Sequence, residues 1–332
     1  MNERGPNPTA GGARCVEPLT LDYIAENQQA LRQDLRRRQG VLRDYVRGVA
    51  RQYATGLYLF GRPGTAKTHT VRDVLEREIR EVYAYRRGHL TPMGLFELIA
   101  GHPDEVIVLD DLGSIFRSEV ALQILLSALE PPKGRDRGRV VAYKRQGHEQ
   151  RVVFRGGIIC ISNRVLHGEE LLGAFKSRVN VLNYDPGDAH LGALMLGLAS
   201  MGWPVDRPTL SAAECGEVAR FLITELLHRG CRFDLRLFID KALANYQQVK
   251  DGEAESDWRD LVAVTIEEHL AEVRHEAEGV ESRAARKEEE HRILLEILRE
   301  CATREERVEE WTRRTGKSER AFYRRLAEVD TR

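Results

Sequence analysis

Eight consecutive residues combine small side chains with a lysine and a hydroxyl at a spacing that suits a bound phosphate. They read Gly61-Arg62-Pro63-Gly64-Thr65-Ala66-Lys67-Thr68. An apolar run typical of a buried strand precedes them at 56–60, and an amphipathic helical pattern follows at 71–79. Such a loop surrounds phosphate oxygens with backbone N–H groups, and the helix N-terminus adds its positive dipole end. The pattern therefore predicts a nucleotide-binding loop whose contacts come from Gly61, Pro63, Gly64, Thr65, Ala66, Lys67, Thr68 and His69.

Lys67 and Thr68 give this loop its chemistry. In such loops the lysine reaches the β- and γ-phosphates of ATP, and the hydroxyl that follows it is a ligand of Mg²⁺. Ala66 departs from the usual pattern, which has a glycine there, so its backbone must be one that a residue with a Cβ tolerates. An ordinary strand-to-helix turn is the alternative, but the Lys-Thr pair and both flanking elements favour nucleotide binding.

Two acids, Asp110 and Asp111, directly follow the apolar run 106–109. A buried strand that ends in carboxylates is what a Mg²⁺–nucleotide site needs opposite a phosphate loop. We expect Asp110 to hold Mg²⁺ close to Thr68, and Asp111 to orient or activate the attacking water. Two exposed acids at a strand end are the alternative, which the preceding phosphate loop disfavours.

Three further polar residues stand at the ends of predicted elements. Asn163 follows the apolar strand 157–162, where its amide could bond a γ-phosphate or the attacking water. Arg178 ends a short helical segment and could reach the nucleotide of a neighbouring subunit. Arg236 lies early in a helix that opens at Phe233.

These motifs span residues 56 to about 245, and the order in which they follow one another resembles that of the AAA+ ATPases. The resemblance implies that 61–68 is the Walker A motif, Asp110-Asp111 Walker B, Asn163 sensor 1, Arg178 an arginine finger acting in trans and Arg236 the sensor-2 arginine of a helical lid. It also implies an ATPase that converts ATP and water to ADP and phosphate with Mg²⁺. Its assembly would be a homo-oligomer, either a hexameric ring or a filament.

Asp111 stands where most of that family has a glutamate. The shorter side chain withdraws the carboxylate by one methylene, roughly 1.5 Å. An Asp-Asp pair is similar to the replication-initiator and helicase-loader branch of the family. We therefore expect the chain to bind ATP and to hydrolyse it slowly.

Residues 139–154 form two β-rich arms around a glycine-containing turn, which predicts a hairpin. Arg139, Lys144, Arg145 and Arg151 decorate it against one acid, Glu149. Hairpins before sensor 1 in similar rings face the central channel and touch nucleic acid or protein, which makes Lys144 and Arg145 candidate DNA contacts. A surface hairpin without a ligand is the alternative.

The C-terminal residues 308–327 are typical of a helix-turn-helix. Gly316 breaks one helix and Ser318 suits the N-cap of the next, while a third helix is predicted around 293–298. We expect its core to contain Trp311, Phe322 and Leu326, and its DNA contacts to be Lys317, Arg320, Arg324 and Arg325. The segment resembles the Fis-like DNA readers. A three-helix module that docks a protein partner is the alternative.

These motifs lie in a chain whose strand and helix patterns alternate between 54 and about 185. We place strands at 56–60, 82–86, 106–110, 157–162 and 179–184, which predicts a parallel sheet. The fold class is thus an α/β parallel-sheet P-loop NTPase core with a helical lid and a C-terminal three-helix unit. The predicted segments are a disordered start followed by a charged helix at 1–53, the nucleotide-binding domain at 54–187, the lid at 188–250, a charged connector at 251–290 and the helix-turn-helix domain at 291–332.

Composition narrows the class of protein further. The chain of 332 residues has a formal net charge of −1, which excludes a globally basic nucleic-acid coat but leaves local patches open. The five cysteines form no C-x-x-C pair, so neither a disulfide framework nor a zinc site is supported. With no apolar run long enough for a bilayer and no apolar signal core, we expect no membrane partner and a cytoplasmic location.

The sequence as a whole predicts an AAA+ ATPase that assembles on DNA or remodels DNA-bound complexes. Replication initiation, helicase loading, transposition and transcription control all fit. Two alternatives remain: a protein-remodelling chaperone similar to the MoxR proteins, and an oligomeric switch that binds ATP with little turnover.

Overall fold

The computed structural model describes residues 18–80, 82–131, 138–145, 148–166, 170–204 and 209–330. The chain divides into two compact units, Met1–Ala263 and Val264–Arg332, which are described separately. The predicted disorder over residues 1–18 falls outside the described residues except at its last position. The finer division into five segments stays a prediction.

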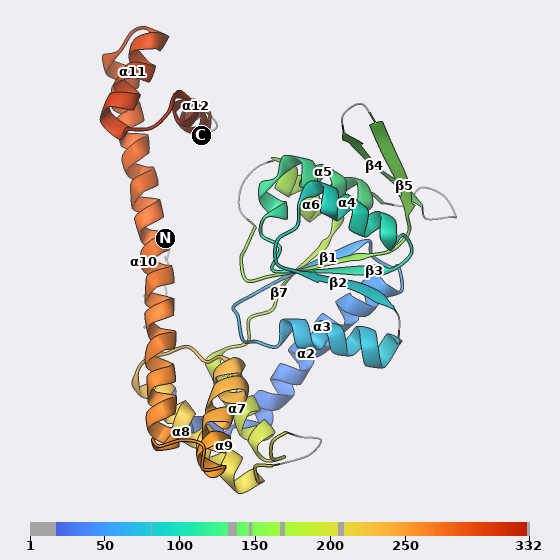
Figure 1. The fold of residues 1–332 in the computed structure, drawn as a ribbon, viewed down its shortest axis with the longest axis vertical. Helices are drawn as coiled ribbons and strands as arrows, with labels where there is room; N and C mark the ends of the chain where they lie inside the picture. Colours follow the sequence, from blue (N-terminus) through green and yellow to red (C-terminus); the bar gives the residue numbers. More distant parts are fainter. Residues whose placement is uncertain are drawn as a thin grey trace, which may run out of the picture. The chain divides into compact units, whose positions relative to one another are not determined.

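Five parallel strands form the sheet of the first unit (Figure 1). They are β1 (Gly56–Phe60), β2 (Tyr83–Arg87), β3 (Val106–Asp110), β6 (Ile158–Ser162) and β7 (Asn180–Asn183), in the order β2-β3-β6-β1-β7. The predicted strands at 56–60 and 106–110 are confirmed at both ends, and the other three shift by one residue at one or both ends. The α/β parallel-sheet prediction is therefore confirmed. Continuous apolar strands suit it because both faces of the sheet are covered.

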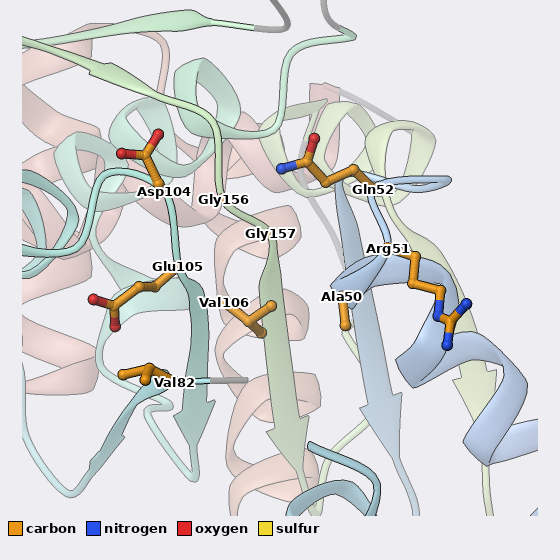
Figure 2. A pocket seen from close by; sticks show the side chains of 9 residues that line it. All are labelled: Ala50, Arg51, Gln52, Val82, Asp104, Glu105, Val106, Gly156 and Gly157. Carbon is orange, nitrogen blue, oxygen red and sulfur yellow. The ribbon is translucent and has the colours of Figure 1, made fainter. Parts of the chain in front are cut away.

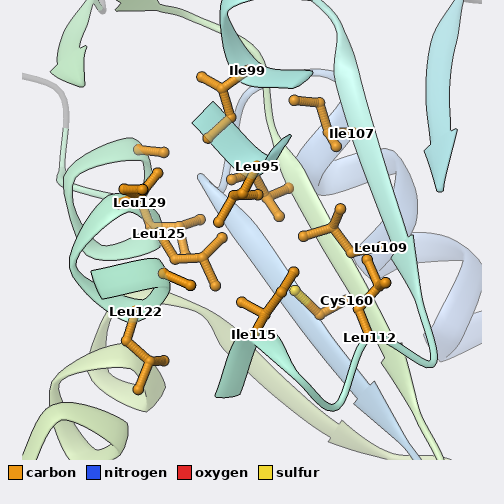
Figure 3. Packing of buried hydrophobic residues seen from close by; sticks show 14 of the residues in the cluster. Leu95, Ile99, Ile107, Leu109, Leu112, Ile115, Leu122, Leu125, Leu129 and Cys160 are labelled. Carbon is orange, nitrogen blue, oxygen red and sulfur yellow. The ribbon is translucent and has the colours of Figure 1, made fainter. Parts of the chain in front are cut away.

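Helices cover the two faces of this sheet (Figure 1). One face packs on α4 (Pro92–Gly101), a 3₁₀ turn (Ile115–Arg117), α5 (Glu119–Ala128) and α6 (Glu170–Arg178), and the other on α2 (Gln28–Ala50), α3 (Lys67–Asp73) and a π-helical segment (Val74–Ile79). Figure 3 shows leucines and isoleucines of α4 and α5 facing β3 and Cys160 of β6. Burial raises the pKa of the Cys160 thiol to about 12, which makes it a packing residue.

Helix α2 belongs to this core although most of its outer residues are charged. Leu42 and Val46 are fully buried with the second face of the sheet. Arg47 on its outer side donates to Glu78 of the π-helical segment, with Nε 2.8 Å from Oε2. The predicted charged helix over 21–52 thus becomes a short α1 (Leu21–Glu26) and a long α2 that supports the sheet.

The helical part that follows the sheet contains α7 (Asp188–Ala199), α8 (Ala212–His228), a π-helical segment (Leu237–Ala242) and α9 (Leu243–Lys250). A capping box of Ser211 and Glu214 fixes the start of α8. Helix α7 packs against α2, and His190 Nε2 lies 2.9 Å from Asp34 Oδ2 across that contact. The helices predicted over 188–250 therefore pack on the same unit as the sheet.

The predicted hairpin is present as β4 (Arg139–Arg145) and β5 (His148–Phe154), paired antiparallel. Its inner face, including Val141 and Phe154, is buried in the sheet's core. The expectation that Arg139 decorates the hairpin is wrong, because this side chain is buried and donates to the carbonyls of Phe154 and Gly156. Its guanidinium lies 4.9 Å from the centre of the Phe154 ring, and burial lowers its pKa to about 10.

The second unit is helical. It contains most of α10 (Trp258–Glu300), then α11 (Arg304–Thr315) and α12 (Glu319–Asp330). Gly316 ends α11 in the left-handed conformation at φ +67°, as its sequence position predicted. Trp311 and Phe322 are buried against Leu294 and Ile297, with Leu326 partly buried beside them, so the predicted core is confirmed. Across the described residues of both units, every helix is too short or too polar to cross a membrane.

Candidate functional site

The carboxyl ends of three neighbouring strands bring three of the four predicted catalytic residues together, namely Lys67, Asp111 and Asn163. Strands β3, β6 and β1 are adjacent and parallel, so the segments that follow them leave the same edge of the sheet. The loop 61–68 follows β1, Asp111 follows β3 and Asn163 follows β6. This edge is where ligands bind in open α/β sheets.

The loop itself has the backbone of a phosphate-binding turn. Gly61 has φ +154°, and a Cβ there would lie 2.0 Å from the carbonyl oxygen of Tyr184. Gly64 has φ +69°, and a Cβ there would meet the Asp234 carboxylate at 1.8 Å. Ala66 is left-handed at φ 64° and ψ 23°, a conformation that costs a residue with a Cβ about 1–2 kcal/mol. The alanine therefore keeps the glycine-like backbone of the pattern at a cost in strain.

Lys67 is buried inside the loop. Its ammonium donates to the carbonyl oxygens of Gly61 at 2.7 Å and Arg62 at 2.6 Å, and to Asn163 Oδ1 at 3.2 Å. Burial lowers its pKa to about 8, with Asp111 acting in the opposite direction. Lys67 thus joins the loop to the tip of β6. Of the other predicted contacts, Thr65 is buried and donates to the Arg62 carbonyl, Pro63 is half-buried, and His69 is exposed on α3.

Thr68 and Asp110 meet as predicted. The Thr68 hydroxyl donates to Asp110 Oδ2 at 3.0 Å, and the carboxylate is only 4 % exposed. The same oxygen accepts a second hydrogen bond, at 2.6 Å, from the hydroxyl of Tyr85 on β2. Sequence reasoning missed Tyr85 because the pairing of β2 with β3 cannot be read from motif spacing.

Asp111 sits at the start of the turn after β3 in the left-handed conformation, at φ 55°. The Asn163 amide donates to both of its carboxylate oxygens, at 3.2 and 3.4 Å. Partial burial, then the charge of Asp110, raises the pKa of Asp111, while Arg87 and Lys67 act against that rise. Positive φ in a residue with a Cβ is a strain that functional sites often hold.

The oxygens of Thr68 and Asp110 are the hard ligands that Mg²⁺ prefers. Within the described ranges, no three His, Cys, Asp or Glu side chains form a group that could hold a metal ion by themselves. Mg²⁺ bound by one carboxylate, one hydroxyl and nucleotide phosphates needs no such group. The residues present therefore fit a Mg²⁺–nucleotide.

The segment around Arg236 contacts the loop directly. The Leu235 N–H donates to the Gly64 carbonyl at 3.0 Å, and Asp234 is buried against Gly64. Arg236 is exposed, and its backbone N–H donates to Asp234 Oδ1 at 2.8 Å. Four of the predicted residues, Lys67, Asp110, Asp111 and Asn163, thus surround one place, and the backbone of the Arg236 segment packs against the loop beside it.

Arg178 lies elsewhere. It ends α6 just before β7, and Asn180 of β7 pairs with Leu57 near the start of β1. Arg178 is therefore at the amino edge of the sheet, opposite the loop. There its Nε donates to Glu130 at 3.2 Å, and the side chain is 28 % exposed. The structure does not bring it to the candidate site of its own chain.

The basic residues predicted to contact DNA fall into two groups. Lys317 and Arg325 are ion-paired with Glu290 of α10, a carboxylate only 4 % exposed, and Arg325 Nε lies 2.7 Å from it. Arg320 and Arg324 are exposed on α12, and Lys144 is exposed on β4. The side chain of Arg145 lies outside the described part of the chain.

A separate cavity of about 430 Å³ opens at the amino edge of the sheet. Figure 2 shows Arg51 and Gln52 on one side and Asp104 and Glu105 on the other, with Gly157 between them. None of the predicted nucleotide contacts lines it. It is thus distinct from the site at the carboxyl edge.

Known proteins share little detectable sequence similarity with this chain. No family model matches the chain, and no curated protein matches it. Among solved structures, NtrX from Brucella abortus in complex with ADP aligns with a TM-score of 0.41 and 14 % identity. The alignment covers 95 % of this chain and 76 % of that chain, a likeness too distant to assign a function. The fold is an α/β parallel sheet covered by helices, with a helical C-terminal part, and its candidate site is the carboxyl edge of the sheet.

Proposed function

We propose that this chain is an AAA+ ATPase that binds Mg²⁺-ATP on the loop 61–68 and hydrolyses it to ADP and phosphate. One observation carries the proposal: a phosphate-type loop, a Thr-Asp pair and an Asp-Asn pair converge on one edge of a parallel sheet. No ordinary strand-to-helix turn requires all three.

Each residue has a role in this proposal. The loop N–H groups and Lys67 bind the phosphates, with the ammonium exchanging loop carbonyls for phosphate oxygens. Thr68 and Asp110 hold Mg²⁺, which supplies charge neutralisation at the β- and γ-phosphates. Asp111 accepts a hydrogen bond from the attacking water, and Asn163 holds that carboxylate in place. The water's oxygen bonds to the γ-phosphorus as the bond to the leaving ADP oxygen breaks.

The site is completed by a neighbouring subunit in this proposal. Arg178 lies at the edge of the sheet opposite its own loop, where its side chain is 28 % exposed. An arginine supplied in trans stabilises transition-state charge and can raise turnover by 10³–10⁵-fold. The assembly would be a ring, such as a hexamer, or a filament.

We further propose that the ATP cycle acts on DNA-bound complexes, as in replication initiation, helicase loading, transposition or transcription control. The exposed Arg320 and Arg324 on α12 support this step. A specific observation favours a second candidate, an ATP-dependent switch with little turnover. Asp111 is shorter than a glutamate, and both of its carboxylate oxygens accept hydrogen bonds from the Asn163 amide.

An ATP-binding and hydrolysis assay with and without duplex DNA separates these functions. Lys67→Ala should abolish nucleotide binding, and Arg324→Ala should remove stimulation by DNA. Arg299→Ala, an exposed arginine on α10, is the matched charge control and should keep it. ATPase activity indifferent to DNA would favour the protein-remodelling chaperone. Binding without turnover, unchanged by Asp111→Asn, would favour the switch, and absence of nucleotide binding would refute the proposal.

A further inference from the structure

The hydroxyl of Tyr85 contacts the residue that would hold the metal ion. It donates to Asp110 Oδ2 at 2.6 Å, and the Thr68 hydroxyl donates to the same oxygen at 3.0 Å. Two donors on one oxygen fix the rotation of the carboxylate. They leave its other oxygen, Oδ1, as the one available to a cation or to the water that bridges to it.

The sheet holds Tyr85 in this position. Strand β2 pairs in parallel with β3, with Tyr85 opposite Val108 and Arg87 opposite Asp110. The Arg72 guanidinium of α3 lies over the tyrosine ring, with its Cζ 5.7 Å from the ring centre. The ring is thus held between the sheet and the helix that follows the phosphate loop.

We propose that Tyr85 is a positioning residue for the divalent cation, because it orients the Asp110 carboxylate that holds the ion with Thr68. This inference rests on the proposed function, in which Thr68 and Asp110 bind Mg²⁺. Asp110 is almost completely buried, so an oxygen that loses a donor there has little water to replace it. Hydrogen-bond partners of metal-binding groups typically contribute 10–100-fold in metal affinity or activity.

The test measures binding and does not need turnover. A fluorescent ADP analogue is titrated into the full chain in Mg²⁺ and in EDTA, and the ratio of the two affinities gives the gain from the metal. Tyr85→Phe removes only the hydroxyl and should reduce that gain about tenfold while the affinity in EDTA stays unchanged.

Tyr83→Phe is the matched control. Tyr83 lies two residues earlier on β2, and its hydroxyl bonds Glu76 and Arg72 instead of Asp110. This variant should keep the full gain from Mg²⁺. In an Asp110→Asn background, Tyr85→Phe should have no further effect, because the oriented carboxylate is gone.

The outcomes separate this inference from the proposed function. If wild type binds the analogue with a gain from Mg²⁺ that Tyr85→Phe leaves intact, the inference is overturned and the nucleotide site stands. An equal loss in Tyr83→Phe, or a loss that persists in the Asp110→Asn background, also overturns it. If wild type binds no nucleotide under either condition, both the proposed function and the inference fail.

Discussion

At the scale of single residues, the site contains two side chains whose backbone conformation suits glycine better. Ala66 and Asp111 are both left-handed, and both stand where the sequence departs from the pattern of related motifs. The departure at Ala66 affects only backbone strain, because the methyl side chain of alanine takes no part in chemistry. The departure at Asp111 places a short carboxylate beside Asn163, where it would affect hydrolysis in the proposed ATPase.

Ala66→Gly should stabilise the protein by about 0.5–1 kcal/mol. Relief of about 1–2 kcal/mol of left-handed strain outweighs the larger unfolded-state entropy of glycine, about 0.5–1 kcal/mol. Urea unfolding followed by circular dichroism measures it. Ala244→Gly, at an exposed helical position, is the control and should cost about 1 kcal/mol. Equal destabilisation by both variants would show that Ala66 is not strained.

Asp111→Asn should stabilise the protein near neutral pH while lowering turnover by about 10²–10⁴-fold. The pKa of Asp111 is raised in the folded state, so the folded protein binds this proton more tightly than the unfolded chain does. The ionised carboxylate therefore costs stability above that raised pKa, and the asparagine does not. The variant's advantage in unfolding free energy should shrink as the pH falls toward the carboxyl's titration range. An advantage that grows on acidification would contradict this assignment.

At the scale of elements, the segment 233–236 holds the first half of the phosphate loop. Leu235 bonds the Gly64 carbonyl, and the Phe233 N–H donates to Asp188, which also pairs with Arg62 of the loop at 2.6 Å. A movement of this helical segment must therefore move the loop. In the proposed function, this arrangement would couple nucleotide binding to the position of Arg236.

Gly64→Ala should break this coupling. Its Cβ would lie 1.8 Å from the Asp234 carboxylate, so the segment or the loop must shift. We expect nucleotide affinity to fall at least tenfold, measured by calorimetry. Asp234→Ala in the same chain should recover part of the loss, since Ala66 shows that this loop accepts a left-handed alanine. A Gly64→Ala variant with wild-type affinity would contradict the docking of the two segments.

In the second unit, Glu290 should be the residue that fixes α12 on α10. Removing a buried carboxylate that pairs with two cations costs about 3–5 kcal/mol, and the partial exposure of Lys317 reduces this to about 2 kcal/mol. Glu290→Ala should speed hydrogen exchange in α11 and α12 of the full chain. Glu289→Ala removes a neighbouring exposed acid and should leave exchange unchanged. Equal exchange in the two variants would show that the Glu290 pairs contribute no stability.

The elements also show what the sequence could predict. Strands β1 and β3 were predictable to the residue because continuous apolar runs end at polar, chemically distinctive groups. Tyr85 and Asp234 were not, since their contacts depend on strand pairing and helix docking across distant segments. Arg139 was misread as a surface charge because its partners, the Phe154 ring and two carbonyls, give no signal in local charge patterns.

At the scale of the whole molecule, the placement of Arg178 decides how subunits would assemble. The loop occupies the carboxyl edge of the sheet and Arg178 the amino edge, so in the proposed ATPase the arginine of one copy would serve the loop of another. Contacts between two different surfaces of identical chains generate rings when they close and filaments when they do not. The proposed assembly is therefore one in which each ATP would be shared between two subunits.

Mixing two inactive variants tests this account most directly. Lys67→Ala cannot bind ATP but still carries Arg178, whereas Arg178→Ala binds ATP but lacks the arginine. The account predicts that wild type hydrolyses ATP, that each variant alone does not, and that the mixture recovers a substantial fraction of wild-type activity. A mixture as inactive as its components, with active wild type and intact assembly, would contradict a site shared between subunits.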